Sequence, residues 1–93
     1  MLTNDELSRW DRESLFHPST NLGQFARGEG AQRIIKGAEG VHIIDRDGNR
    51  LLDGFAGLYC VNVGYGRREI ADAIARQAQD LAYYHAYAGN GSE

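Results

Sequence analysis

The chain has 93 residues, a formal net charge of −3 and a pI near 5.5, which bound it to one small, mildly acidic domain at most. Its 42% hydrophobic and 25% charged residues are typical of a soluble globular protein, and the lack of a basic run argues against nucleic acid as a partner. No apolar run is long enough for a membrane span, residues 1–10 do not resemble a signal peptide, and the single cysteine excludes an internal disulfide, so we expect a cytoplasmic protein.

The N-terminal segment is expected to form an amphipathic helix followed by a loop. Thr3 or Asn4 can cap the helix, whose first residues are acidic. We expect the helix to end near Ser14, because Pro18 forbids its continuation. Residues 16–30 are rich in glycine and polar residues without a sustained period, and they predict a long loop that is functional or docked onto something else.

The middle of the chain predicts a small antiparallel β-meander. Its three short strands are separated by glycine-containing turns and are expected at residues 33–36, 41–45 and 50–53. The first turn is expected at residues 37–40. Asp47 and Gly48 are a strong signal for a two-residue turn, because glycine tolerates the positive φ that such a turn demands.

The next segment, residues 52–66, is apolar, aromatic and interrupted by glycines, and it is too irregular for a plain strand or helix. A segment of that kind usually lines something. It leads into an amphipathic helix expected over residues 68–81, where apolar residues recur at helical spacing. Three tyrosines follow with no further segment to cover them: Tyr83, Tyr84 and Tyr87. Exposed aromatic clusters usually mark an interaction surface, so the chain is expected to be a piece of something larger.

Several residue types that often carry chemistry receive structural interpretations here. The three histidines lack metal-ligand spacing, so no metal site is expected. Cys60 has no local base and is expected to be a small buried residue. Lys36 lies in a polar context that does not suit a catalytic lysine. Residues 64–66, Gly-Tyr-Gly before a helix, could hold a phosphate, although a tight turn is the better interpretation.

Tyr59 and Tyr87 are the best functional candidates from the pattern alone. Each lies in an irregular apolar segment beside small residues, as the walls of a ligand pocket do. The alternative is that both are core residues.

Two consecutive runs carry a family resemblance. Residues 40–53 read GVHIIDRDGNRLLD, and residues 56–66 read AGLYCVNVGYG. Together they resemble the class III pyridoxal-phosphate aminotransferases. The GYGRRE of residues 64–69 is similar to the ω-amino acid or amine:pyruvate branch, whereas many other relatives carry Gly-His-x-His-Pro there. His17-Pro18 and Tyr83-Tyr84-His85 also resemble that branch.

The resemblance implies an α/β parent enzyme of fold type I in which this chain forms an α+β segment: an N-terminal helix, a small antiparallel β-meander and a helix. It also implies a division into three parts. Residues 1–30 would form the N-terminal helix and a substrate-side loop, residues 31–66 the meander and pocket-lining segment of the small domain, and residues 67–93 the helix and aromatic segment leading into a large domain.

The implied activity is a pyridoxal-phosphate-dependent transfer of an amino group from an amine or ω-amino acid to pyruvate or another keto acid. The implied assembly is a homodimer with pocket residues shared across subunits. Leu58 and Tyr59 match the pair that lines the substrate pocket, where the second position is often tryptophan. Tyr87 matches an aromatic residue that reaches across the subunit interface. Ser19 matches a position that is often aromatic, where a serine would alter substrate choice.

The family's cofactor-binding lysine, the aspartate that pairs with the cofactor's ring nitrogen and the phosphate loop all lie later in its sequences. We therefore expect no catalytic and no cofactor-binding residue in this chain, and we expect it to be the N-terminal part of a transaminase that is inactive alone. A rival interpretation is a non-catalytic binding or dimerisation module derived from the small domain. Without the resemblance, the residues indicate only a small α+β domain.

Overall fold

A computed structural model describes residues 1–92. The elements in chain order are α1 (Asn4–Ser14), α2 (Leu22–Ala26), β1 (Ile35–Glu39), β2 (His42–Asp45), β3 (Arg50–Leu52), α3 (Ala56–Tyr59), α4 (Arg68–Asp80) and the 3₁₀ turn η1 (Tyr87–Gly89). The order of helix, antiparallel meander and helix confirms the predicted α+β segment. Glu93, the last residue of the third predicted part, lies outside the described residues.

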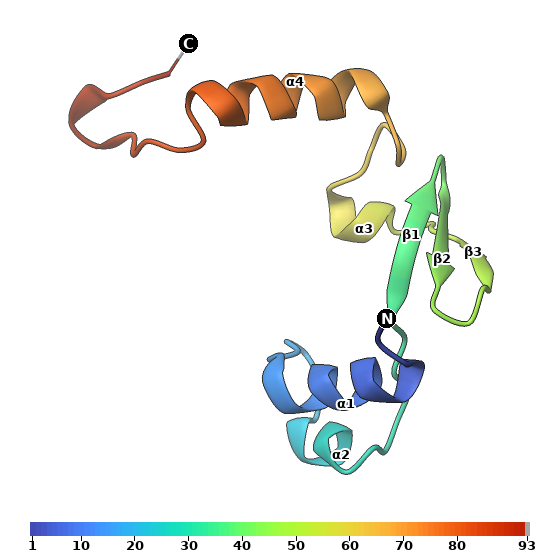
Figure 1. Ribbon diagram of the computed structural model, residues 1–93. Helices are drawn as coiled ribbons and strands as arrows, with labels where there is room; N and C mark the ends of the chain where they lie inside the picture. The colour runs from blue at the N-terminus through green and yellow to red at the C-terminus, as the bar shows by residue number, and fades with distance from the viewer. Residues whose placement is uncertain (93) are drawn as a thin grey trace.

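The arrangement is open. The two N-terminal helices lie together at one end, the sheet lies in the middle, and α4 with the C-terminal segment extends from the other end (Figure 1). The radius of gyration is 17.5 Å, whereas a compact chain of this length would have about 12 Å. Within residues 1–92, only Phe25 and Asp45 are buried, so most large apolar side chains are exposed. No helix in this part of the chain is long and apolar enough to cross a membrane.

Helix α1 begins as the sequence predicts. The Glu6 amide donates to the Thr3 hydroxyl at 3.2 Å, and the Thr3 amide donates to the Glu6 carboxylate at 2.8 Å. This reciprocal pair is a capping box, which satisfies two backbone donors that the first turn leaves free. The helix ends at Ser14, as predicted.

Helix α2 was not predicted, so the expectation of an unbroken loop over residues 16–30 is wrong. The Asn21 side chain caps the helix by accepting from the Gln24 amide at 3.1 Å. Phe25 is only 8% exposed and packs its ring edge against His17, with ring centroids 4.7 Å apart. His17 in turn lies 3.0 Å from the Asp11 carboxylate on α1. A helix of five residues has too little periodicity to be read from sequence, and packing against α1 stabilises it.

The sheet has the order β1-β2-β3 with both pairs antiparallel. The expected first turn at residues 37–40 is wrong, because β1 continues through Gly37 and Ala38 to Glu39. The chain turns instead at Gly40, whose φ of 59° suits glycine, and the pairing of Glu39 with His42 fixes the position of this turn. A glycine inside a strand is unfavourable in isolation, so pairing with β2 outweighs the local preference.

The second turn is longer than predicted. Gly48 donates to the Asp45 carbonyl at 3.1 Å, and the Asp45 amide donates to the Asn49 carbonyl at 3.0 Å, so three residues instead of two lie between the hydrogen-bonded Asp45 and Asn49. Gly48 has a φ of 89°, as expected where a three-residue hairpin loop ends in a left-handed residue. The Asp45 carboxylate stabilises the loop by accepting from the amides of Asp47 and Asn49 at 3.1 and 2.8 Å.

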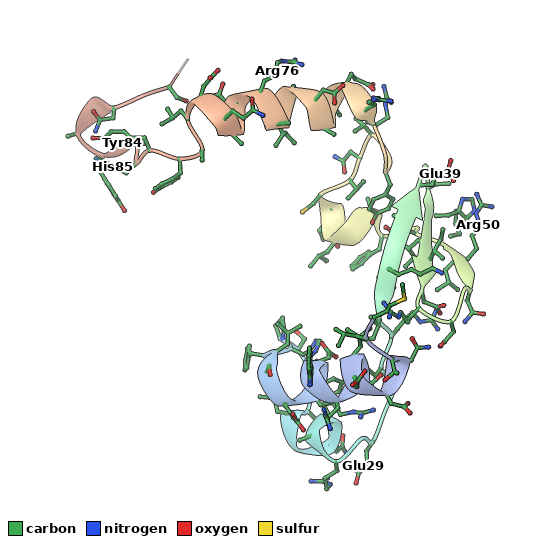
Figure 2. All side chains as sticks on the ribbon, in the orientation of Figure 1. Glu29, Glu39, Arg50, Arg76, Tyr84 and His85 are labelled. Atoms are coloured by element: carbon green, nitrogen blue, oxygen red, sulfur yellow. The ribbon has the colours of Figure 1, made fainter. Side chains whose placement is uncertain are left out.

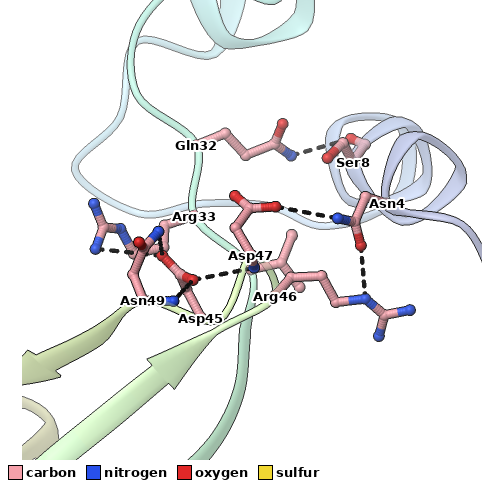
Figure 3. A pocket seen from close by; sticks show the side chains of 9 residues that line it. Asn4, Ser8, Gln32, Arg33, Asp45, Arg46, Asp47 and Asn49 are labelled. Atoms are coloured by element: carbon pink, nitrogen blue, oxygen red, sulfur yellow. Dashed lines mark hydrogen bonds and ion pairs between the residues drawn. The ribbon is translucent and has the colours of Figure 1, made fainter.

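The first residues of α1 contact this hairpin through polar groups. Asn4, Arg46 and Asp47 lie at the junction, which also borders a polar cavity of about 150 Å³ (Figure 3). The Asn4 side-chain amide donates to the Asp47 carboxylate at 3.1 Å, and Gln32 donates to the Ser8 carbonyl at 3.0 Å. The N-terminal helices are therefore attached to the sheet by hydrogen bonds.

Helix α4 is amphipathic, and no residue in it is buried. Arg76 lies on the face directed away from the sheet (Figure 2). Ile70 and Ile74 lie at the spacing of one helical face and remain exposed. The predicted helix is confirmed, although the last predicted residue, Leu81, is its C-terminal cap.

Candidate functional site

The segment between β3 and α4 contains an unusual turn at α3. Four successive residues, Ala56, Gly57, Leu58 and Tyr59, have φ values of 47°, 59°, 69° and 67°. The amides of Leu58 and Tyr59 both donate to the Phe55 carbonyl at 3.0 Å. These residues therefore form one turn of left-handed helix. Outside glycine this backbone region costs about 1–2 kcal/mol per residue, so three of the four positions are strained.

The carboxylate of Asp53 holds this turn. Its Oδ1 accepts from the Phe55 amide at 3.1 Å, and its Oδ2 accepts from the Gly57 amide at 2.9 Å. The same Oδ2 accepts from the Tyr65 hydroxyl at 2.5 Å. The Tyr65 hydrogen bond contributes most to holding the pKa of Asp53 below its ordinary value of 3.8, and the two amide bonds act in the same direction. The bond to Asp53 also raises the pKa of Tyr65.

Both members of this pair are fixed to the sheet. The Asp53 amide donates to the Val41 carbonyl at 2.8 Å, next to the end of β3. Tyr65 and Gly40 exchange two backbone hydrogen bonds of 2.7 and 3.1 Å. The turn is therefore held between two points that the sheet itself positions.

Glycine avoids close contacts at two positions around the pair. A Cβ atom at Gly57 would lie 3.0 Å from Val61 Cγ2 and 3.1 Å from the Tyr65 hydroxyl oxygen. A Cβ atom at Gly64 would lie 3.0 Å from the carbonyl oxygen of Gly40. A larger residue at Gly64 would therefore crowd the bridge between Gly40 and Tyr65.

The predicted site residues lie in three separate places. Leu58 and Tyr59 are adjacent on the left-handed turn and are 56% and 74% exposed. Tyr87 lies in η1, which does not contact α3, and Ser19 lies in the loop before α2. Within residues 1–92 the structure therefore brings only Leu58 and Tyr59 together. The alternative that Tyr59 and Tyr87 are core residues is wrong for this part of the chain, since both are exposed.

Strained backbone with positive φ occurs at or next to the predicted site residues. Ser19 has a φ of 53°, Leu58 and Tyr59 belong to the left-handed turn, and Ala88, next to Tyr87, has a φ of 56°. Non-glycine residues with positive φ are uncommon and concentrate where a chain binds ligands or switches conformation.

The C-terminal aromatic residues stack in a row. The rings of Tyr84 and His85 have centroids 4.4 Å apart, and those of His85 and Tyr87 are 5.5 Å apart. Tyr84 and His85 lie on the loop that follows α4 (Figure 2). The predicted exposed aromatic cluster is thus present, with Tyr83 and Tyr87 as its most exposed members.

Sequence reasoning missed the Asp53–Tyr65 pair. An aspartate at the end of a strand, followed closely by glycine, is a signal for a side chain that caps a turn. Nothing in the pattern connects it with a tyrosine twelve positions later. Sequence reasoning was also wrong about Cys60, which is exposed because it borders an open groove of about 300 Å³ between this segment and α4.

Two of the three backbone amides at Gly64-Tyr65-Gly66 are not free to hold the phosphate of pyridoxal phosphate. A phosphate at Gly64-Tyr65-Gly66 would need free backbone donors. The Gly64 amide already donates to Val61 at 3.2 Å and the Tyr65 amide to Gly40 at 2.7 Å, so the tight-turn interpretation of this segment holds. Lys36 is exposed on β1.

Comparisons with known proteins agree on one family. A model of the class III aminotransferases matches residues 24–90. The diaminobutyrate–2-oxoglutarate transaminase of Halomonas elongata is 50% identical over 93 residues, which cover 100% of this chain and 20% of that protein. The putrescine–pyruvate aminotransferase of Pseudomonas aeruginosa is 44% identical over 89 residues, covering 92% of this chain and 19% of that protein.

Solved structures give the same result. A transaminase structure from work on directed evolution by ancestral reconstruction superposes with a TM-score of 0.87 at 57% identity, covering 96% of this chain and 20% of that one. An (S)-enantioselective omega-transaminase from Thermomicrobium roseum superposes with a TM-score of 0.84 at 40% identity, covering 98% and 20%. The chain spans about a fifth of the length of the curated relatives it matches. It belongs to the class III aminotransferase family.

Proposed function

We propose that this chain lines the amino-donor pocket of a pyridoxal-phosphate-dependent transaminase. The enzyme would move an amino group from an amine or ω-amino acid to pyruvate or another keto acid in two half-reactions. The observation that carries the proposal is the strained left-handed turn that exposes Leu58 and Tyr59, in a chain that matches the class III aminotransferases. Strain of this kind is retained where it serves a site.

Pyridoxal phosphate, when bound, would act as the electron sink and temporary carrier of the amino group. We assign its contacts to parts of the protein other than residues 1–92, because the family resemblance places the cofactor-binding residues later in the sequence. The contribution of this chain is an apolar wall. Leu58 and Tyr59 would orient the carbon skeleton of the donor and exclude water beside the reacting carbon.

Two relatives support an amine donor but differ in the acceptor. One is named for putrescine and pyruvate, and the other for diaminobutyrate and 2-oxoglutarate. Both donors carry two amino groups on a short chain. We therefore propose a donor whose amino group is carried on an extended aliphatic skeleton, with the acceptor to be decided between pyruvate and 2-oxoglutarate.

We also propose a homodimer in which Tyr87 helps to shape the pocket of the other subunit. Tyr87 is exposed, and η1 makes no contact with α3 of the same chain. Tyr87 would therefore reach Leu58 and Tyr59 of the other subunit through a dimer interface. Ser19, which is exposed and has a positive φ in the loop before α2, would shape the smaller of the two substrate pockets.

The test is to express the chain together with the sequence that follows it in its gene. We expect the purified protein to bind pyridoxal phosphate with a visible absorbance band, and to convert an ω-amine plus a keto acid into the corresponding carbonyl compound and amino acid. A product that neither binds the cofactor nor transfers the amino group would refute the proposal. Cooperative unfolding of the 93-residue chain alone, with a stop codon directly after it, would support the rival binding module.

A further inference from the structure

The left-handed turn has few supports of its own. The amides of Leu58 and Tyr59 donate to the Phe55 carbonyl, and the side chains of both residues are exposed. Tyr59 makes one aromatic contact, with Phe55, at a centroid distance of 5.2 Å. Non-glycine residues would leave the left-handed region unless another group held them in it.

Asp53 and Tyr65 are the groups that hold the turn. The Asp53 carboxylate joins the Gly57 amide, inside the turn, to the Tyr65 hydroxyl, outside it. The Tyr65 hydroxyl oxygen also closes the space above Gly57, where a Cβ would approach it to 3.1 Å. Removing this hydroxyl would take one of two donors from Asp53 Oδ2 and open that space. The lost hydrogen bond and the opened space would both loosen Gly57, which directly precedes Leu58.

The geometry points to Asp53 and Tyr65 as positioning residues that set the donor selectivity of the enzyme, by fixing the direction in which Leu58 and Tyr59 project. This inference rests on the proposed function. Neither residue needs to touch the substrate. A change of φ from left-handed to right-handed at Leu58 or Tyr59 would redirect the side chain, so the shape of the pocket wall depends on a hydrogen bond behind it.

The variants are Tyr65→Phe and Asp53→Asn in the complete protein, assayed with two amino donors, one short and unbranched and one bearing an aryl ring. For Tyr65→Phe we expect KM of the aryl donor to change about tenfold, the scale of a lost hydrogen bond to a charged group, while kcat with the short donor is largely retained. The ratio of kcat/KM for the two donors therefore shifts. The absorbance of the bound cofactor should stay unchanged.

Two control variants separate positioning from a general loss of stability. Asp45→Asn alters a carboxylate that also accepts two turn amides, but in the β2–β3 hairpin. It should lower Tm without changing the donor ratio. Ser14→Ala removes the hydroxyl of an exposed residue at the end of α1 and should change neither. A donor ratio that moves as much in Asp45→Asn as in Tyr65→Phe would overturn the inference.

Hydrogen exchange supplies a readout that does not depend on activity. In the wild-type protein the Gly57 amide should exchange slowly, and in Tyr65→Phe it should exchange faster while the strand amides do not change. Rapid exchange of the wild-type Gly57 amide would overturn the inference even if the variants fail to fold. If the wild-type enzyme is active and Tyr65→Phe keeps the same donor ratio, this inference is overturned and the proposed function stands. A wild-type protein without transaminase activity overturns both the inference and the proposed function.

Discussion

Arg46 on the β2–β3 hairpin donates from Nε to the side-chain oxygen of Asn4, at 2.9 Å, across 42 positions of sequence. Its Nη2 donates to the Leu2 carbonyl at 2.8 Å. One side chain thus holds both the segment before α1 and the first turn of α1 against the sheet. Because no apolar core joins these parts, the position of the N-terminal helices depends on polar contacts of this kind.

We expect Arg46→Ala to detach the start of α1 without unfolding the sheet. The bonds are exposed, so the free energy of unfolding should fall by no more than about 1 kcal/mol. The measurement is hydrogen exchange of residues 4–14, which should become faster. Arg27→Ala is the matched control, because Arg27 pairs with Glu29, only two positions away, and should leave this exchange unchanged. Equal effects of the two variants would contradict the role assigned to Arg46.

The hairpin should show a pH dependence that originates at Asp45. The side-chain amide of Asn49 contributes most to holding the pKa of Asp45 below its ordinary value of 3.8. A folded-state pKa below the unfolded value means that the stabilisation is present above that value and is lost as the pH falls through the folded pKa. We expect the Tm difference between wild type and Asp45→Asn to shrink between about pH 5 and pH 2. Parallel Tm curves for the two proteins over this window would show that the carboxylate charge is not responsible.

Gly57→Ala should destabilise the left-handed turn through steric contact as well as backbone strain. The new methyl group would approach Val61 and the Tyr65 hydroxyl, at 3.0 and 3.1 Å, and we expect a loss of about 1–3 kcal/mol in denaturant unfolding. Gly30→Ala is the control, because Gly30 also has a positive φ, of 83°, but no atom lies within 4 Å of its Cβ position. The difference between the two variants isolates the contribution of packing against Tyr65. A difference near zero would show that the contact is easily relieved.

Under the proposed function, Tyr59→Ala should enlarge the donor pocket. The ring of Tyr59 is 74% exposed, so its removal disturbs little of the chain's own packing. We expect the ratio of kcat/KM for an aryl amine over a short amine to rise about tenfold, as is usual when a pocket wall is cut back. Trp10→Ala removes a ring on α1 that is 47% exposed and lies outside the proposed pocket, and it should leave the ratio unchanged.

The elements that could be predicted are those specified by local signals. The cap candidates Thr3 and Asn4 with the acidic residues after them identify the start of α1, and the spacing of Ile70 and Ile74 identifies α4. The family could also be identified, because residues 40–66 match it in order and spacing. The missed features depend on contacts between distant parts of the chain. Helix α2 depends on Phe25 packing against His17, and β1 extends past Gly37 only because β2 pairs with it.

The candidate site likewise has features that the sequence predicts and features that depend on distant contacts. Tyr59 could be named from the sequence because it lies in an irregular apolar segment, and Leu58 could be named only from the family resemblance. Their left-handed backbone could not, since positive φ is expected for glycine and not for leucine or tyrosine. The hydrogen bond between Asp53 and Tyr65 was equally invisible, because it joins a strand end to a bridge residue that folding alone brings together.

The backbone of the left-handed turn has a consequence for any attempt to make this protein more robust. Glycine at Leu58 or Tyr59 would relieve an unfavourable φ of about 1–2 kcal/mol, offset in part by the greater freedom of glycine in the unfolded chain. Such a replacement would also delete the side chain that the proposed pocket needs. Under the proposed function, thermostability and substrate discrimination would therefore compete at the same two positions. A stabilised variant that keeps its selectivity would have to gain its stability elsewhere, at the polar junction of α1 with the hairpin or in the capping of α4.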